Sequence, residues 1–404
     1  MSVPGLGIGL GIGLGMGMGM GVDALVLNSG SPTALQVLRC LDSGGVGCAL
    51  ADQRPPDDLL AARSRLHRSF YRYSGWEDFL RIGEEVPGAV LISCDDRSIY
   101  SLSEHFQELS KYFRIPFPDH SVLVRGQDKA EAWRACLEAG VPTPRTYQPS
   151  PGEVRDLSRS LEYPVLVKPR LTLGFIPQHA RKLYVCRTAG ELESSYDAVN
   201  RTHPDPLIQE RIPGGDDSVY QIMVLMDREQ GLVGSFCFRK LAQWPLRYGV
   251  GCLCVSVHLP VLLEQTLSFL REIGWFGVAS IEYKHDPRDD LFKLIDVNTR
   301  FCGETNLAMA AGLNFPLALY HLAWGEQVSL GEYPDGVYWT DFYKTLRNLR
   351  FRFKSGSYSG MPRTFLRAID PRTTHTSLSI RDPGPAAMRA EKMLSRVLAA
   401  FTGS

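Results

Sequence analysis

Residues 294–300 read Leu-Ile-Asp-Val-Asn-Thr-Arg, an apolar start followed by a polar residue at every second position. Successive side chains of a β-strand point to opposite faces, so Asp296, Asn298 and Arg300 share one face if this segment is a strand. Two oxygen ligands and a guanidinium on one face are groups that hold a divalent cation and a phosphate. The segment therefore predicts a strand with a functional polar face.

A second strand and a turn precede this segment. Residues 279–284 also read as a strand, and residues 286–290 between the two are rich in the turn formers Asp and Pro. The pattern predicts a β-hairpin that brings Glu282 beside Asp296. Two carboxylates and an amide oxygen around one point suit Mg2+, and Arg300 would then hold a phosphate. Alone, such a short motif is more typical of a solvated surface hairpin. Other segments of the chain must therefore decide whether the hairpin is a metal site.

Composition excludes some classes of partner. The chain has 404 residues with 44 basic and 44 acidic side chains, a balance that gives no bulk attraction to nucleic acid or an anionic membrane. The nine cysteines lack the paired spacing of a metal site, which predicts reduced thiols and a cytoplasmic protein. Residues 5–21 alternate Gly with Leu, Ile and Met and lack the features of a signal peptide. We expect residues 1–21 to form a disordered tail.

Residues 22–125 alternate short apolar strands with helices, which predicts a parallel-sheet α/β domain. Strands are expected at residues 22–27, 46–50 and 89–93, and helices at residues 33–41 and near residues 76–82. Residues 28–31, Asn-Ser-Gly-Ser, follow the first strand at a helix start, where a phosphate is able to bind. They lack the spacing of a dinucleotide fingerprint, so we expect a plain strand-to-helix turn.

Two lysines stand at the ends of elements in the next segment. Lys129 precedes a helix that runs to residue 139, and Lys168 ends the apolar strand at residues 163–169. A lysine at a strand end usually reaches solvent, yet both positions also allow a cation to meet a phosphate. Residues 170–181 are polar and basic, as expected of a mobile flap, and residues 206–215 form a strand that runs into a turn.

In this order, the segments resemble the ATP-grasp ligases, and within them the D-aspartate ligase-like group of carboxylate-amine ligases. The blocks that carry the resemblance are Gln127-Asp128-Lys129 with residues 140–144, residues 165–169, 207–214, 281–284 and 295–300. The resemblance implies an α/β and α+β chain with the ATP-grasp fold. It places a parallel-sheet pre-ATP-grasp domain at residues 22–125 and the ATP-grasp domain at residues 126–333. The implied lid subdomain lies at about residues 164–214, and residues 334–404 form an extension that packs on the core.

The resemblance also implies a role for each polar position, with ATP held between two subdomains and Mg2+ beside it. The implied phosphate ligands are Lys129 and Lys168, and the implied adenine hinge is Gln209, Glu210, Arg211 and Ile212. Asp217 is the implied ligand of the ribose hydroxyls, and Asp216 is a nearly equal candidate for that role. The implied Mg2+ ligands are Glu282, Asp296 and Asn298. Two Mg2+ ions are expected, with Mn2+ as an alternative. The family usually has glutamate where this chain has Asp296, and a flap richer in glycine, which leaves Gly174 and Arg181 without a clear role.

The chemistry of such a ligase explains these charges. A carboxylate is a poor electrophile, so ATP converts it to an acyl phosphate, which an amine then attacks as phosphate leaves. Such phosphoryl transfer depends on charge neutralisation. We expect Arg300 to stabilise the acyl phosphate and the oxyanion, and Lys240 rather than Arg239 to point inward after the strand at residues 234–238. The predicted protein is an ATP-dependent ligase that couples a small-molecule carboxylate to an amine and releases ADP, without nucleic-acid or membrane partners. The sequence leaves the oligomeric state open, and the resemblance implies a homodimer formed through the N-terminal domain.

Two alternatives stay open. Residues 298–300 with Glu304 also resemble biotin carboxylases, which phosphorylate bicarbonate, although Cys302 replaces the polar residue expected there. Glu304 is equally explained as an acid at the start of a helix over residues 305–311. The second alternative is a non-catalytic ATP-binding scaffold, which Asp296 in place of glutamate supports and the other charged site positions oppose. Residues 333–353 are aromatic and basic, which fits an element packed on the core better than a nucleic-acid surface.

Overall fold

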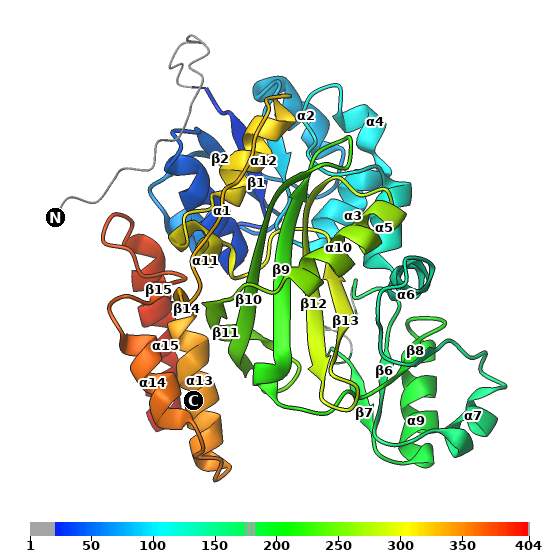
Figure 1. Cartoon of the computed structure of the whole chain (residues 1–404). Helices are drawn as coiled ribbons and strands as arrows, with labels where there is room; N and C mark the ends of the chain where they lie inside the picture. The colour runs from blue at the N-terminus through cyan, green and yellow to red at the C-terminus, as the bar shows by residue number, and fades with distance from the viewer. Residues whose placement is uncertain (1–20, 174, 176–178, 180–181, 403–404) are drawn as a thin grey trace.

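The computed structural model describes residues 21–402 except residues 174, 176–178, 180 and 181, with only the backbone described from residue 396 onward. The expected tail, apart from Gly21, and the flap positions Gly174 and Arg181 lie outside the described residues. The described chain forms three β-sheets with helices around them (Figure 1).

The first sheet is the predicted parallel sheet. Its four strands lie in the order β3-β2-β1-β4, and β1 pairs in parallel with both β2 and β4. The Ser31 hydroxyl caps α1 by accepting from the Ala34 amide, so the turn after β1 leads directly into a helix. The elements are β1 Ala24–Leu27, α1 Pro32–Asp42, β2 Cys48–Asp52, β3 His67–Arg72, α2 Asp78–Glu85, β4 Val90–Ile92, α3 Asp96–Glu104, α4 Phe106–Leu109 and α5 His120–Gln127, with 3-10 turns at Pro56–Asp58 and Ala61–Arg63.

The second sheet is small and antiparallel, in the order β5-β8-β6-β7. Its core contains the apolar side chains of β6 and β8 and the buried face of α9, where Leu192, Tyr196 and Val199 meet them. The sheet begins at residue 146, earlier than the predicted lid at residue 164, because the short strand β5 pairs with β8. The elements of this part are α6 Lys129–Glu138, β5 Thr146–Tyr147, α7 Val154–Ser160, β6 Val165–Lys168, β7 Tyr184–Cys186, α9 Ala189–Asn200 and β8 Leu207–Glu210.

The third sheet has seven strands in the order β13-β12-β9-β10-β11-β14-β15. It contains the predicted hairpin: β12 and β13 are antiparallel, and the turn at residues 286–290 joins them. Its elements up to the hairpin and the two helices that follow are a 3-10 turn at Asp216–Ser218, β9 Val219–Met226, β10 Leu232–Trp244, β11 Val250–Ser256, α10 Pro260–Glu272, β12 Gly277–Asp286, β13 Leu291–Asn298, α11 Thr305–Ala310 and α12 Phe315–Ala323.

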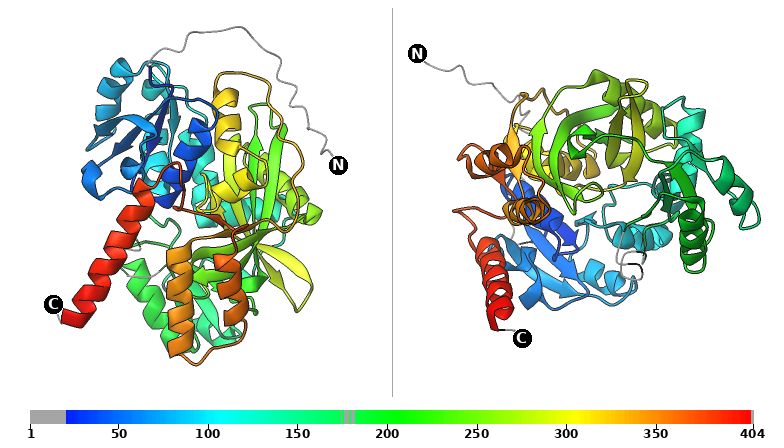
Figure 2. Two further views of the ribbon diagram at one scale, coloured as in Figure 1. Left: turned by 90° about the vertical axis from the view of Figure 1, so that its left-hand side faces the viewer. Right: turned by 90° about the horizontal axis from the view of Figure 1, so that it is seen from below.

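The C-terminal extension adds strands to this sheet as well as helices to its outside. β14 pairs with β11, and β15 then pairs in parallel with β14. Figure 2 shows α13, α14 and α15, coloured orange to red, on the outside of the molecule. The elements are β14 Tyr338–Thr340, α13 Phe342–Lys354, α14 Met361–Ile369, β15 Thr374–His375 and α15 Gly384–Thr402. No helix in the described part of the chain combines the length and the apolar sequence needed to cross a bilayer.

The parallel domain and the large sheet share their apolar cores. One buried cluster joins Leu25 and Leu27 of β1 to Ile281 of β12 and to Trp275, whose side chain is fully buried. Close packing of this kind resists relative movement of the parts it joins. The carboxyl edge of the parallel sheet is therefore held in a fixed position relative to the β12-β13 hairpin.

Candidate functional site

A cavity lies between the small sheet and the β12-β13 hairpin of the large sheet. Strands β6 and β8 border it on one side, β12 and β13 on the other, and the start of α6 adds a lysine. The predicted site residues that line it are Lys129, Lys168, Gln209, Glu210, Arg211, Ile212, Glu282 and Asp296. Folding thus brings together several segments that are far apart in the sequence.

Each predicted carboxylate of the hairpin is paired with a lysine. Glu282 and Asp296 are direct partners in the antiparallel register, as predicted. Lys240 Nζ lies 2.8 Å from Glu282 Oε1, and Lys129 Nζ lies 3.1 Å from Asp296 Oδ1. The two hairpin carboxylates are therefore each paired with a lysine from another element, Lys240 from β10 and Lys129 from α6.

The surrounding lysines keep Asp296 ionised. Burial acts to raise the pKa of Asp296, but the charges of Lys129, Lys168 and Lys182 outweigh it and lower that pKa to about 2. Lys182, just before β7, also lines the cavity, and the sequence analysis did not select it. The only signal for it was a basic residue directly after the polar segment at residues 170–181.

Lys168 is a buried amine at the centre of the cavity wall. Its side chain is 9% exposed, and its Nζ donates to Gln209 Oε1 at 2.7 Å and to the Ile295 carbonyl at 3.3 Å. Burial and then the nearby charge of Lys129, opposed by Asp296, lower the pKa of Lys168 to about 8. The amine is therefore charged at neutral pH but close to its titration point.

The donor set fits Mg2+. Asp296 Oδ1 has only the Lys129 amine near it, at 3.1 Å and outside hydrogen-bond geometry, and a carboxylate oxygen has a second lone pair for a metal ion. Asn298 Nδ2 donates to the Ser280 carbonyl at 3.2 Å, which fixes its amide, and Asn298 Oδ1 lies 3.4 Å from an Arg300 nitrogen. Among the described residues, no group of three or more His, Cys, Asp or Glu side chains is arranged to hold a metal. A metal here would therefore need the amide oxygen as well as the two carboxylates.

The side chains of the predicted adenine hinge are already engaged. Gln209 accepts from Lys168 and donates to Thr146, while Glu210 accepts from Arg145 and from Arg288. The Ile212 N–H has no backbone acceptor among the described residues, so this amide is able to donate to the edge of a base. Arg211 Nε donates to the Tyr248 hydroxyl at 3.1 Å, which fixes one wall of the cavity.

The structure does not bring Asp217 to the cavity. This carboxylate is 64% exposed and lies 3.4 Å from Arg239, on a 3-10 turn outside the lining. Asp216 accepts from the Gln243 and Arg247 amides. The ribose assignment for Asp217 therefore has no support in this geometry, because the turn directs its side chain to Arg239.

Arg300 is held by the parallel domain. Its Nε and a terminal nitrogen donate to the two carboxylate oxygens of Asp96 at 2.9 and 2.8 Å. Burial lowers the pKa of Arg300, but Asp96 outweighs it and raises that pKa. A bidentate pair of this kind fixes the plane of the guanidinium.

Lys240 is 1% exposed and points inward, as predicted, whereas Arg239 is partly exposed. Burial lowers the pKa of Lys240, but Glu282 and Glu304 outweigh it and raise that pKa. Glu304 is 4% exposed, and burial raises its pKa. Glu304 is outside the cavity lining, as are Lys240, Asn298 and Arg300.

Comparison with known proteins identifies the fold of this chain. No family model matches it. It resembles the biotin carboxylase domain of the 2-oxoglutarate carboxylase of Hydrogenobacter thermophilus with a TM-score of 0.63 and 18% identity, over 78% of this chain and 73% of that one. It resembles the N5-carboxyaminoimidazole synthetase of Staphylococcus aureus with a TM-score of 0.63 and 11% identity, over 83% of this chain and 86% of that one. The chain has an ATP-grasp fold after a parallel-sheet domain, which confirms the predicted fold.

A sequence relative gives a narrower likeness. The chain is 26% identical to a D-aspartate ligase of Enterococcus faecium (strain Aus0004) over 252 residues. The match covers 58% of this chain and 58% of that protein, so it spans less than two thirds of the curated relative. The likeness to carboxylate-amine ligases that the sequence blocks indicated is thereby confirmed.

Proposed function

We propose that this protein is an ATP-dependent ligase that activates a small-molecule carboxylate as an acyl phosphate and couples it to an amine. The observation that carries the proposal is the alternation of charge across the cavity. Two hairpin carboxylates lie opposite each other, each is paired with a lysine, and a third, buried lysine stands across from them. Alternating charge of this kind suits a polyphosphate and its counter-ions.

We assign the nucleotide contacts to groups that line the cavity. Lys129 and Lys168 supply cations to the phosphates, and Lys182 supplies a third. The Ile212 N–H is the free donor for the edge of an adenine, because the hinge side chains are occupied. The ribose contact is left to the backbone, since Asp217 and Asp216 both lie outside the lining.

Glu282, Asp296 and Asn298 are the proposed Mg2+ ligands. Bound there, Mg2+ would neutralise phosphate charge and align the γ-phosphoryl group with its acceptor. We expect two Mg2+ ions, and Mn2+ as a substitute for them. Because Asp296 stands where the family usually has glutamate, titration of the protein with Mg2+ is the measurement that counts the ions.

The chain's own residues support both half-reactions. A carboxylate oxygen of the acid attacks the γ-phosphorus of ATP, and the bond to ADP breaks. The amine nitrogen then attacks the acyl carbon, phosphate leaves, and the amine gives up a proton. We assign to Arg300, whose guanidinium Asp96 holds, the stabilisation of negative charge on the acyl phosphate and on the tetrahedral oxyanion. Lys240 holds Glu282 in position from inside the sheet.

The geometry disfavours the bicarbonate alternative. That reading needs Glu304 as a base in contact with substrate, yet Glu304 is only 4% exposed. We accordingly keep small-molecule carboxylate and amine substrates. A homodimer and a cytoplasmic location remain our expectations, the latter because all nine cysteines are free and buried.

The test is release of ADP and phosphate by purified protein with Mg-ATP against a matrix of carboxylates and amines, with mass spectrometry of the products. The proposal expects release that requires one acid and one amine together with a condensed product. Release with bicarbonate alone would favour the carboxylase alternative, and ATP binding without release would favour the scaffold.

Two variants of one hairpin separate site loss from fold loss. Asp296→Asn removes the proposed metal ligand, while Asp290→Asn changes an exposed Asp in the hairpin turn. Asp290 has a φ of 58°, which asparagine adopts readily, and its side chain is 94% exposed. We expect Asp290→Asn to retain turnover and Asp296→Asn to lose it.

A further inference from the structure

The C-terminal extension carries exposed apolar side chains on two of its helices, α13 and α14. The five that we call the α13–α14 face are each between 44% and 64% exposed: Phe353, Tyr358, Phe365, Leu366 and Ile369. Phe365 and Leu366 stand four and three positions before Ile369, so these three share one side of α14. Single exposed apolar residues are normal, whereas a contiguous group of them marks a binding surface.

The loop between α13 and α14 makes this surface continuous. The rings of Phe353, near the end of α13, and Tyr358, in the loop, lie 5.7 Å apart. The Met361 amide donates to the Tyr358 carbonyl at 3.1 Å, which leads the loop directly into α14. Figure 2 shows the two helices side by side on the outside of the molecule, and they are in contact.

The inner side of α13 is fixed to the large sheet. Thr345, Asn348 and Leu349 are its buried residues. Asn348 Nδ2 donates to the Gln243 carbonyl of β10 at 2.7 Å. Because Gln243 lines the proposed nucleotide cavity, the α13–α14 face is attached to the same strand as that site.

The segment that carries the face is strongly basic. Residues 342–369 contain seven basic residues and no acid: Lys344, Arg347, Arg350, Arg352, Lys354, Arg363 and Arg367. We expected no membrane partner because the acids and bases of the whole chain balance, but that balance does not hold in this segment. A local excess of one charge attracts a partner of the opposite charge.

Four of these cations are exposed and free of partners within the described part of the chain. No ion pair or hydrogen bond of a side chain joins them to another described residue: Arg347, Arg350, Lys354 and Arg363. The acids at the two ends of the segment, Asp341 and Asp370, are each already paired with two cations. These four cations are therefore available to anions outside the chain.

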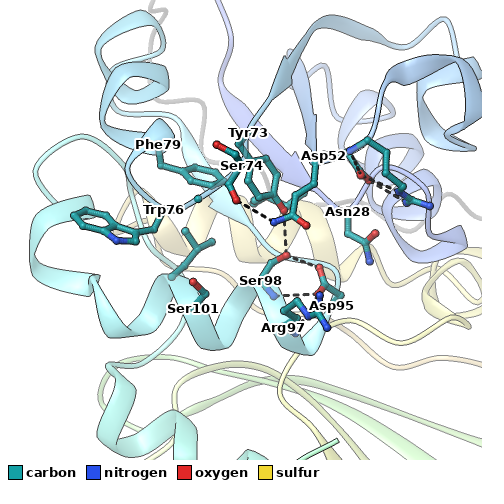
Figure 3. Close-up of a pocket in the computed structure, with 15 residues that line it drawn as sticks. Asn28, Asp52, Tyr73, Ser74, Trp76, Phe79, Asp95, Arg97, Ser98 and Ser101 are labelled. Atoms are coloured by element: carbon teal, nitrogen blue, oxygen red, sulfur yellow. Dashed lines mark hydrogen bonds and ion pairs between the residues drawn. The ribbon is translucent and has the colours of Figure 1, made fainter. Parts of the chain in front are cut away.

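The loops after β2 and β4 show the contrasting arrangement. In the cavity at this edge of the parallel sheet, Asp52 accepts from Arg54 Nε at 3.1 Å, and Asp95 accepts from the Ser98 hydroxyl at 2.7 Å (Figure 3). These acids find their donors within the chain.

Exposed apolar side chains beside unpaired cations match the surface of an anionic bilayer. A helix that lies on a membrane places its apolar side at the boundary of the acyl chains, while Lys and Arg meet the lipid headgroups. Phe365, Leu366 and Ile369 suit the first contact. Arg350 and Lys354 suit the second.

Other occupants match these observations less well. In a two-fold contact with a second copy, the basic segment would meet an identical basic segment. Single-stranded nucleic acid stacks on aromatic rings, and the aliphatic Leu366 and Ile369 offer no such ring. Residues 1–20 contain no acid, so they bring no charge to match the cations.

We infer that the α13–α14 face docks on an anionic lipid bilayer and holds the protein at its surface. The apolar side chains enter the boundary between headgroups and acyl chains, and the unpaired cations bind the lipid phosphates. The inference goes beyond the proposed function, because this binding requires neither ATP nor substrate.

The test is sedimentation of the full chain with lipid vesicles. Vesicles of equal parts phosphatidylcholine and phosphatidylglycerol are compared with vesicles of phosphatidylcholine alone. We expect about tenfold or more tighter binding to the anionic vesicles, and weaker binding at high salt.

A first pair of variants tests the apolar contact. Leu366→Glu is expected to weaken binding to the anionic vesicles by about tenfold or more, because it removes a buried leucine and adds a repelled charge. Leu137→Glu is the matched control, since Leu137 is an exposed leucine of α6, and it should bind as the wild type does. Equal melting temperatures of the two variants and the wild type would show that the fold is kept.

A second pair of variants tests the cations. The double variant Arg350→Gln with Lys354→Gln is expected to weaken binding by about 10- to 30-fold. Arg155→Gln with Arg159→Gln is the matched control, because these two exposed arginines of α7 have the same spacing on their helix. The control should leave binding unchanged.

Several results would overturn the inference. They are no binding to either vesicle, equal binding to both, or equal binding by Leu366→Glu and the wild type. Binding of a single-stranded oligonucleotide without vesicle binding would assign the face to nucleic acid instead. A dimer that Leu366→Glu dissociates, in a protein that binds no vesicle, would assign it to a second copy.

Discussion

The buried lysine of β6 gives the sharpest quantitative expectation. Lys168→Met keeps the length of the side chain but removes its charge and its hydrogen bond to Gln209. A pKa lowered from the usual 10.5 to about 8 means that burial disfavours the charged amine by about 3 kcal/mol. Losing the partner of a buried acceptor costs about 1–3 kcal/mol in the opposite direction. The free energy of unfolding at neutral pH is therefore expected to stay unchanged or to rise by up to about 2 kcal/mol.

The affinity for ATP is expected to behave in the opposite way. A charged hydrogen bond to phosphate is worth about 1.5–3 kcal/mol, so the Kd for Mg-ATP should rise by about 10- to 150-fold. Urea unfolding gives the first quantity, and calorimetry with a non-hydrolysable ATP analogue gives the second. Lys354→Met, which changes an exposed lysine of α13, is the control for both. A Lys168→Met variant that is several kcal/mol less stable and binds ATP with unchanged affinity would show that Lys168 stabilises the fold and does not bind phosphate.

The remaining predictions concern the same site. The folded-state pKa of Lys168 lies below its unfolded value, so the unfolded chain binds one more proton between pH of about 8 and 10.5. The free energy of unfolding of the wild type should therefore rise with pH in this range. Lys168→Met should not show that rise. ATP affinity should fall as the pH rises through about 8, since the neutral amine binds phosphate weakly, and calorimetry at several pH values checks this. Lys240→Met leaves Glu282 and Glu304 without their cation, so we expect the free energy of unfolding to fall by about 3–5 kcal/mol. Lys240→Arg restores the charge and should recover the stability. A Lys240→Met variant as stable as the wild type would show that the ion pair does not stabilise the fold. Asp296→Asn should lose Mg2+-dependent turnover and keep its melting temperature within a few degrees, and wild-type turnover would remove the metal assignment.

The hairpin could be predicted because local physics determines it. The turn residues between the two strands fix the register, and the alternation of polar side chains fixes which face they share. Glu282 and Asp296 consequently stand opposite each other in the structure as the sequence indicated. The strand-helix order of the first domain followed from apolar runs in the same way, although β3 was missed because Arg68, Ser69 and Arg72 interrupt its pattern.

The parts that the sequence did not reveal depend on long-range contacts. Arg300 meets Asp96, which is 204 positions earlier in the chain, and no local pattern connects the two. The side chain of Glu210 is occupied by Arg145 and Arg288, which reduces the predicted hinge to its backbone. Strands β14 and β15 are too short to show a period, so their addition to the large sheet could not be read from the C-terminal extension.

The central claim is that the carboxylate is activated as an acyl phosphate, and an oxygen label tests it most directly. In that reaction one carboxylate oxygen leaves with the γ-phosphoryl group. With the acid found in the substrate matrix labelled with 18O in its carboxylate, the account predicts that the released phosphate gains one 18O atom per turnover, as measured by mass spectrometry. Phosphate released with only unlabelled oxygen, while the amide product forms, would contradict it.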